Sequence, residues 1–173
     1  MSKNIVLIGM RGSGKTTIAK LLSKKLNKEF LELDDILVKK EGSSIRELVS
    51  KKGWDYFRDK ESEIVKEVLS LNNKIISTGG GVVVRNQNIE TLRKNGVLIY
   101  LKASLNTLLK RIGEDKNRPP LTDKKNTREE IEEVLRGREE LYKNSADEII
   151  VTDDLNEEQT AVQIIKQLNN LTM

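Results

Sequence analysis

Short apolar runs alternate with amphipathic stretches along the whole chain of 173 residues. Several runs are apolar at consecutive positions, which is typical of parallel strands covered on both faces. We expect five strands, at Asn4–Gly9, Phe30–Leu33, Lys74–Thr78, Val97–Leu101 and Glu148–Val151. Helical periodicity predicts helices at Lys15–Leu26, Ser43–Leu71 in two parts, Asn88–Lys94, Ser104–Ile112, Thr127–Tyr142 and Asn156–Leu168. The alternation predicts an α/β fold, a five-stranded parallel sheet flanked by helices in three α/β/α layers.

Two segments depart from this alternation. The stretch between the second and third strands has about 40 residues, more than one crossover helix needs, so a small helical insertion is predicted over about 34–62. Residues 113–126 are strongly charged, contain both prolines and show no periodicity, which predicts a mobile loop. Thr127 followed by Glu130 has the form of a capping box and predicts a helix start. The length favours one domain, 1–173.

Composition removes several classes of function. The chain has no cysteine and no histidine, which excludes disulfides, thiolate metal sites and histidine bases. Basic and acidic residues are interspersed, with a net charge of +4 and 3% aromatic residues, so we expect no nucleic-acid partner. No apolar run is long enough to span a bilayer, and Met1–Asn4 leads directly into the first strand, so we expect a cytoplasmic protein that binds no membrane.

One motif carries specific chemistry. Residues 9–16, GMRGSGKT, match G-x-x-x-x-G-K-[ST] between a predicted strand and a predicted helix. In such a loop the backbone N–H groups of Gly12, Ser13, Gly14 and the helix start surround phosphates. Lys15 then reaches the β- and γ-phosphates, Thr16 can ligate Mg²⁺, and Thr17 follows in the first helical turn. The alternative is an ordinary glycine turn followed by a surface lysine.

Within the P-loop proteins, the length and layout favour a small kinase. A GTPase would carry an Asn-Lys-x-Asp segment, which the sequence lacks, and a motor-type ATPase would need a longer chain. Phosphoryl transfer depends mainly on positioning and charge neutralisation, which a chain without histidine or cysteine can supply.

The sequence resembles the shikimate kinases, small P-loop proteins related to nucleoside-monophosphate kinases, nearly from end to end. Besides the P-loop, the resemblance rests on Leu33-Asp34, Phe57-Arg58, Gly79-Gly80-Gly81, Arg118-Pro119, and Arg138 followed by Leu141-Tyr142. It implies transfer of the ATP γ-phosphate to the 3-hydroxyl of shikimate, in chorismate and aromatic amino-acid biosynthesis. We expect ATP and Mg²⁺ as cofactors and a monomer as the active form.

The resemblance assigns the acceptor site. Arg58 and Arg138 would bind the shikimate carboxylate, because a planar guanidinium binds a carboxylate with two hydrogen bonds. Asp34 would accept the attacking hydroxyl's hydrogen bond and proton. The backbone of Gly79, Gly80 and Gly81 would approach the ring closely, and Phe57 would pack against it. The alternatives are solvent-exposed arginines paired with local acids, an aspartate that caps the next helix, and a flexible glycine turn.

The resemblance also assigns the nucleotide side. Residues 113–126 would form a lid whose Arg118 neutralises charge on the transferring phosphate; the alternative is a solvated loop arginine. Arg111 would stack on adenine or else lie on the surface. Arg11 either contacts phosphates or points to solvent.

Three features differ from the family pattern. Glu32-Leu33-Asp34 replaces Asp-x-Asp, so Glu32 is a candidate to hold Mg²⁺ through water. The lid has a second proline, Pro120, which would stiffen it. No strand ends in a Walker-B aspartate, so Mg²⁺ would be held by Thr16, phosphates and waters.

Two other functions remain open from the sequence. One is a kinase of the same architecture for another small metabolite, such as gluconate or a nucleoside monophosphate. The other is an ATP-binding module without turnover. The paired arginines and the position of Asp34 favour a small hydroxylated acid as acceptor.

Overall fold

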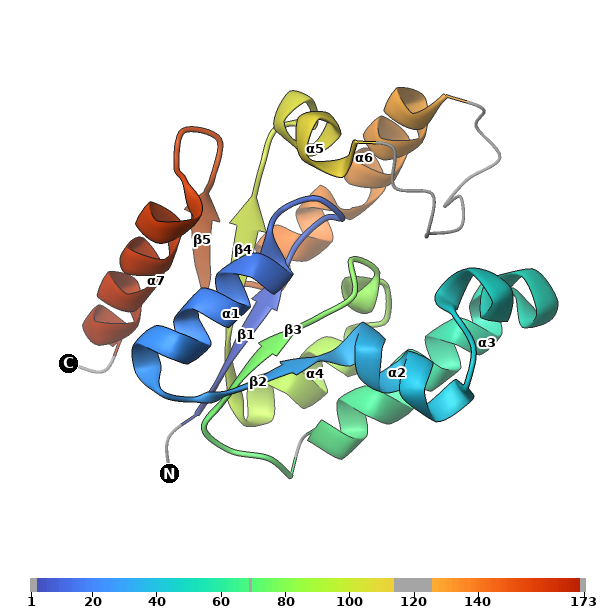
Figure 1. The fold of residues 1–173 in the computed structure, drawn as a ribbon, viewed down its shortest axis with the longest axis horizontal. Helices are drawn as coiled ribbons and strands as arrows, with labels where there is room; N and C mark the ends of the chain where they lie inside the picture. Colours follow the sequence, from blue (N-terminus) through green and yellow to red (C-terminus); the bar gives the residue numbers. More distant parts are fainter. Residues whose placement is uncertain (1–2, 69, 114–125, 172–173) are drawn as a thin grey trace.

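Five parallel strands form the sheet at the centre of the molecule in the computed structural model, which describes residues 3–68, 70–113 and 126–171 (Figure 1). The strands are β1 (Asn4–Ile8), β2 (Glu29–Glu32), β3 (Lys74–Ser77), β4 (Gly96–Lys102) and β5 (Glu148–Val151). Their order in the sheet is β2-β3-β1-β4-β5, and every neighbouring pair is parallel. The predicted α/β fold is confirmed.

Helices cover both faces of this sheet. They are α1 (Lys15–Leu26), α2 (Leu33–Glu41), α3 (Ile45–Val68), α4 (Asn86–Lys94), α5 (Leu105–Ile112), α6 (Thr127–Ser145) and α7 (Glu157–Leu171), with a short 3₁₀ helix η1 at Val82–Val84. Helices α1 and α7 lie side by side on one face, as Figure 1 shows. Helices α3, α4 and α6 pack on the other face.

The alternation of side chains along the strands divides the core into two clusters. Val6 and Ile8 of β1 belong to the larger cluster, which includes side chains of α3, α4 and α6. Ile5 and Leu7 belong to the smaller cluster, with side chains of α1 and α7. Because successive strand residues point to opposite faces, one apolar run supplies both cores.

The element boundaries differ from the predicted ones mainly where a strand meets a helix. Leu33 begins α2 instead of ending β2, and α2 is a separate helix that the periodicity did not predict. Helix α6 does begin at Thr127, but its cap is Asn126, whose side chain accepts a hydrogen bond from the Arg128 N–H at 2.9 Å. The predicted capping box between Thr127 and Glu130 is therefore wrong.

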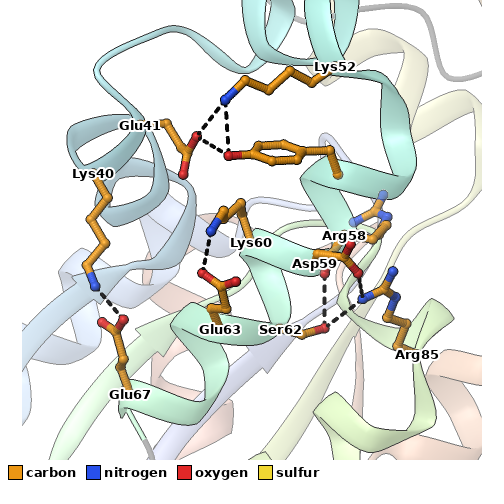
Figure 2. Close-up of polar contacts among 11 residues, drawn as sticks. Lys40, Glu41, Lys52, Arg58, Asp59, Lys60, Ser62, Glu63, Glu67 and Arg85 are labelled. Atoms are coloured by element: carbon orange, nitrogen blue, oxygen red, sulfur yellow. Dashed lines mark hydrogen bonds and ion pairs between the residues drawn. The ribbon is translucent and has the colours of Figure 1, made fainter.

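The segment between β2 and β3 folds as α2 and α3, which lie against each other. Gly53 interrupts α3 with φ 82° and ψ 170°, so the helix consists of two pieces. Figure 2 shows the polar contacts that join them to α2. The Tyr56 hydroxyl donates to Glu41 at 3.0 Å, Lys52 on the other side of Gly53 lies 3.6 Å from the same carboxylate, and Lys40 pairs with Glu67.

Within the described ranges, every helix is too short or too polar to cross a lipid bilayer. Most of the predicted loop 113–126, with Arg118 and Pro120, lies outside the described residues.

Replacing Gly96 should destabilise the sheet. A Cβ at Gly96 would lie 2.8 Å from both the Leu92 carbonyl oxygen and Val6 Cγ2, so β4 would have to shift away from β1. We expect Gly96→Ala to lower the free energy of unfolding by about 1–3 kcal/mol in urea titrations. Gly137→Ala is the control, because Gly137 lies in α6 with open space around it and should gain up to about 1 kcal/mol. Equal stability of the two variants would contradict the packing at Gly96.

Candidate active site

The loop between β1 and α1 has the backbone of a phosphate-binding loop. Gly9, Gly12 and Gly14 all have positive φ, at 147°, 83° and 91°. A Cβ at Gly12 would lie 2.6 Å from Ile112 Cγ1 at the end of α5, so the loop fits its surroundings only with glycine there. Gly14 caps α1, which places the free N–H groups of the helix start inside the loop.

Lys15 and Thr16 extend from the first turn of α1. Lys15 is buried, and its Nζ donates hydrogen bonds to the carbonyl oxygens of Gly9 and Met10 at 2.9 and 3.0 Å. Thr16 donates to Glu32 Oε2 at 2.7 Å. The alternative of a surface lysine after an ordinary turn is wrong.

Glu32 lies at the end of β2 beside the P-loop. Burial raises the pKa of its carboxyl, and the negative charge of Asp34 also raises it, whereas the hydrogen bond from Thr16 and the charge of Lys15 lower it. A hydroxyl and a carboxylate at this spacing are ligands suited to Mg²⁺, directly or through water. Among the described residues, no three His, Cys, Asp or Glu side chains form a metal site of their own.

A cavity of about 570 Å³, here called the P-loop cavity, opens above these residues. Its walls come from the loop and α1, from the ends of β2 and β3, from α5 and from the segment after β5. Its lining residues are Arg11–Ile18, Glu32, Asp34, Thr78, Arg111, Ile112, Thr152, Leu155, Glu157 and Thr160. The strand ends place this cavity at the carboxyl edge of the sheet, where ligands bind in open α/β folds.

Arg111 lines the P-loop cavity from the last turn of α5. Its guanidinium donates to the Thr152 hydroxyl at 2.9 Å and to the Thr152 carbonyl oxygen at 2.8 Å. Arg111 is thus an exposed arginine, as the surface alternative held, but its guanidinium is fixed by these two hydrogen bonds. The sequence did not predict the segment after β5, which contributes Thr152 and Leu155, because it carries no glycine motif and its acidic residues, such as Asp153 and Asp154, match no nucleotide-binding pattern.

A second, smaller cavity adjoins the first and is here called the arginine cavity. It is lined by Met10, Arg11, Asp34, Ile45, Trp54, Phe57, Arg58, Glu61, Gly79–Gly81 and Arg138. The structure thus brings together every acceptor-site residue that the resemblance assigned. Arg11 and Asp34 line both cavities, so they mark the place where the two meet.

Arg58 is buried against aromatic rings and a carboxylate. Its Nη1 lies 2.6 Å from Glu61 Oε2, and its guanidinium lies 5.0 Å from the centroid of Phe57 and 5.3 Å from that of Trp54. The two rings pack edge to face, with centroids 5.5 Å apart. The alternative of a surface arginine paired with local acids is correct about the pairing, since Arg58 pairs with Glu61. It is wrong about the location, because the pair is buried.

Glu61 was not predicted as a site residue. It is 3% exposed, and burial raises the pKa of its carboxyl although the Arg58 charge opposes the shift. Its Oε1 has no hydrogen-bond partner within the part of the chain that the structure describes. The only signal in the sequence is an acid three residues after Arg58, which exposed helices also show frequently.

Arg138 reaches the cavity from α6. Its Nη1 donates to the Gly80 carbonyl oxygen at 3.2 Å, and Tyr142, one turn later, donates to the same oxygen. Burial lowers the pKa of Arg138 and raises that of Tyr142 to about 12. The alternative of a fully solvated charged helix face is wrong for Arg138.

The glycine triplet leaves room for the charged side chains. A Cβ at Gly81 would overlap the Arg58 guanidinium, and one at Gly79 would lie 2.8 Å from Asp34 Oδ1 and 2.9 Å from Glu61 Oε1. The side chains therefore pack directly on bare backbone, and a merely flexible turn does not describe this segment.

Asp34 is not the cap of a helix. It lies inside the first turn of α2, whose cap position is Glu32. The carboxylate instead lines both cavities, which contradicts the capping alternative.

A parallel sheet with a phosphate loop at its edge, opening onto a second cavity with paired arginines and a shared carboxylate, defines a small P-loop kinase. The shikimate kinase family model matches residues 11–169, and the chain belongs to this family.

Solved and curated relatives agree over nearly the whole length. The chain is 42% identical to a shikimate kinase of Thermodesulfovibrio yellowstonii, covering 98% of this chain and 97% of the relative. It is 41% identical to one of Clostridium botulinum, with 95% of each covered. The structure of a shikimate kinase from Acinetobacter baumannii in complex with shikimate aligns with a TM-score of 0.95 at 31% identity, covering 100% of this chain and 96% of the other.

The buried Glu61 should make stability depend on pH. The pKa of Glu61 in the native state is raised above the ordinary value of 4.5, which applies to the unfolded state. Between the unfolded-state and native-state pKa values, the Glu61 carboxyl is therefore ionised in the unfolded protein and still protonated in the native one. Stability is then lost as the pH rises through this window, by up to about 1.4 kcal/mol for each pH unit. We expect the stability of the unaltered protein relative to Glu61→Gln to fall from acid to neutral pH in urea titrations.

Glu63→Gln is the control for this experiment, because Glu63 lies on the same helix with its side chain 55% exposed. Its stability relative to the unaltered protein should not show this fall. A relative stability of Glu61→Gln that stays constant with pH, or changes in the opposite direction, would contradict the buried state of Glu61.

Proposed function

We propose that this chain transfers the γ-phosphate of ATP to the 3-hydroxyl of shikimate, giving shikimate 3-phosphate and ADP. The observation that carries the proposal is that Asp34 lines both the P-loop cavity and the arginine cavity. A hydroxyl bound beside this carboxylate lies next to the end of a triphosphate held by the P-loop. Membership in the shikimate kinase family supports the choice of acceptor.

The nucleotide occupies the P-loop cavity. Backbone N–H groups of residues 12–17 surround its phosphates, and Lys15 exchanges its two carbonyl contacts for the β- and γ-phosphate oxygens. Arg111 lies at the base end, held by Thr152. Thr16, and Glu32 through water, would hold Mg²⁺, which supplies charge neutralisation on the phosphates.

Shikimate occupies the arginine cavity. Arg58 and Arg138 bind its carboxylate, and the pairing of Arg58 with Glu61 fixes the guanidinium for that contact. The ring lies against Phe57 and against the backbone of Gly79–Gly81. These contacts leave the hydroxyls toward Asp34 at the junction of the cavities.

In the transfer step, the 3-hydroxyl oxygen forms a bond to the γ-phosphorus while the bond from that phosphorus to the β-phosphate oxygen breaks. Asp34 orients the hydroxyl and accepts its proton late in the step, and ADP leaves with the electron pair of the broken bond. Lys15 stabilises the charge that develops on the phosphates. Arg118, which lies outside the described residues, would add positive charge from the lid at 113–126.

We retain the remaining predictions from the sequence as parts of this proposal. They are one domain with the acceptor-binding insertion at about 34–62, a monomeric and cytoplasmic enzyme, and no nucleic-acid or membrane partner.

An acceptor screen tests the proposal. ADP release, followed by a coupled assay with ATP and Mg²⁺, should be stimulated by shikimate and not by gluconate or nucleoside monophosphates. Stimulation by one of the other acceptors would assign a different kinase. Nucleotide binding with no stimulated turnover would indicate a module that lacks catalysis.

Neutralising Asp34 should abolish most turnover. We expect Asp34→Asn to lower kcat with shikimate by about 10²–10⁴-fold, the usual range for a positioned acid or base. Asp35→Asn is the matched control, because Asp35 carries the same charge in the same helical turn but lines neither cavity. Similar losses in the two variants would mean that the charge of the helix start, and not the position of Asp34, supports the reaction.

A further inference from the structure

Arg11 occupies an unusual place in the P-loop. Arg11 lines both the P-loop cavity and the arginine cavity, yet its side chain is only 12% exposed. Its Nη2 lies 2.8 Å from Oε1 of Glu130, on the first turn of α6 and 119 residues away in the sequence. The alternative that Arg11 points to solvent is therefore wrong.

The pair is nearly enclosed by protein. The Glu130 side chain is 8% exposed, and the Nε of Arg11 is buried without a hydrogen-bond partner in the described ranges. Removing one partner of such a pair leaves an uncompensated buried charge, whereas replacing both by apolar side chains is frequently neutral. Stability alone therefore does not explain why both charges are present, and the place of Arg11 in the lining of both cavities indicates a role in the site.

Helix α6 contacts the site at a second place. Arg138, eight residues after Glu130 and about 12 Å further along the helix axis, binds the Gly80 carbonyl oxygen. Tyr142 binds the same oxygen and stacks on Tyr100 of β4 with ring centroids 5.0 Å apart. Helix α6 thus contacts the glycine triplet through Arg138 and Tyr142, and it contacts the P-loop through Glu130 in its first turn.

We propose that Arg11 and Glu130 are positioning residues, which hold the first turn of α6 on the phosphate loop and thereby set where Arg138 meets the acceptor. A rigid helix fixed at both places presents Arg138 at one distance from the γ-phosphate position. Without the pair, α6 keeps its contacts with Gly80, Tyr100 and Met10 and its packing in the larger core cluster, but its first turn loses the ion pair that joins it to the phosphate loop. This inference rests on the proposed shikimate kinase activity.

A double-mutant cycle tests it. We expect Arg11→Met and Glu130→Met each to raise the KM for shikimate about tenfold, equivalent to about 1.4 kcal/mol, with less than about a threefold change in the KM for ATP. The double variant should be no worse than the poorer single variant, since residues that act as a pair are not additive. The double variant also keeps the test valid if a single variant unfolds, because it leaves no unpaired charge.

Glu132→Met serves as the control, because Glu132 lies on the same helix, is about half exposed and pairs only loosely with Arg136 at 3.5 Å. It should leave both KM values unchanged. Thermal unfolding of all variants separates folding from binding.

Three outcomes would overturn the inference. In the first, the variants lose thermal stability while the KM for shikimate is unchanged, which indicates a purely structural pair. In the second, Arg11→Met raises only the KM for ATP and Glu130→Met has no effect, which makes Arg11 a phosphate ligand. In the third, the unaltered protein does not turn over shikimate, which removes the proposed function as well; the first two leave that function intact.

Discussion

The structure depends on the requirement that each buried charge of the arginine cavity has a partner of opposite charge or a hydrogen-bond partner. One small cavity is lined by four charged residues, Asp34, Arg58, Glu61 and Arg138. Burial raises the pKa of Glu61 and lowers that of Arg138, because it penalises the charged form of each side chain. Such a cluster persists only where each charge has a partner or a bound ion. The pairing of Arg58 with Glu61 and the carbonyl contact of Arg138 meet part of this need. A carboxylate ligand between the two guanidinium groups would meet more of it.

The glycine triplet is what makes this crowding geometrically possible. Arg58 lies so close to Gly81 that any Cβ there would overlap its guanidinium, and Gly79 bears the same relation to Asp34. Arg58 and Asp34 therefore lie directly against backbone, and Arg58 also contacts the Phe57 and Trp54 rings. The triplet directly follows β3, an inner strand that pairs with β1 and β2.

The features that could be predicted from the sequence are those that depend on residues close together in the chain. Consecutive apolar residues predicted β1, and the spacing of Gly9, Gly14 and Lys15 predicted the loop that follows it, because both depend on neighbours in the chain. Residues whose roles depend on contacts with distant parts of the chain were not predicted, or were predicted incorrectly. Glu130 had the spacing of a capping box but pairs with Arg11, and Glu61 looked like any helical acid until its burial was known. The roles proposed for Arg58 and Arg138 rest on the family resemblance, since a charged residue on a helix gives no local indication of the cavity that it faces.

The two core clusters divide the molecule in a way that bears on how its sequence can diverge. The apolar lining of the arginine cavity, Met10, Ile45, Trp54 and Phe57, belongs wholly to the cluster shared by α3, α4 and α6. Helix α7 and the buried face of α1 belong to the other cluster, on the opposite side of the sheet. Substitutions among Leu22, Ala161 and Ile164 therefore change the stability of the protein without touching the lining of the arginine cavity. Adaptation to a new metabolite would then be confined to one face of the sheet, whereas adaptation to a new growth temperature could use both.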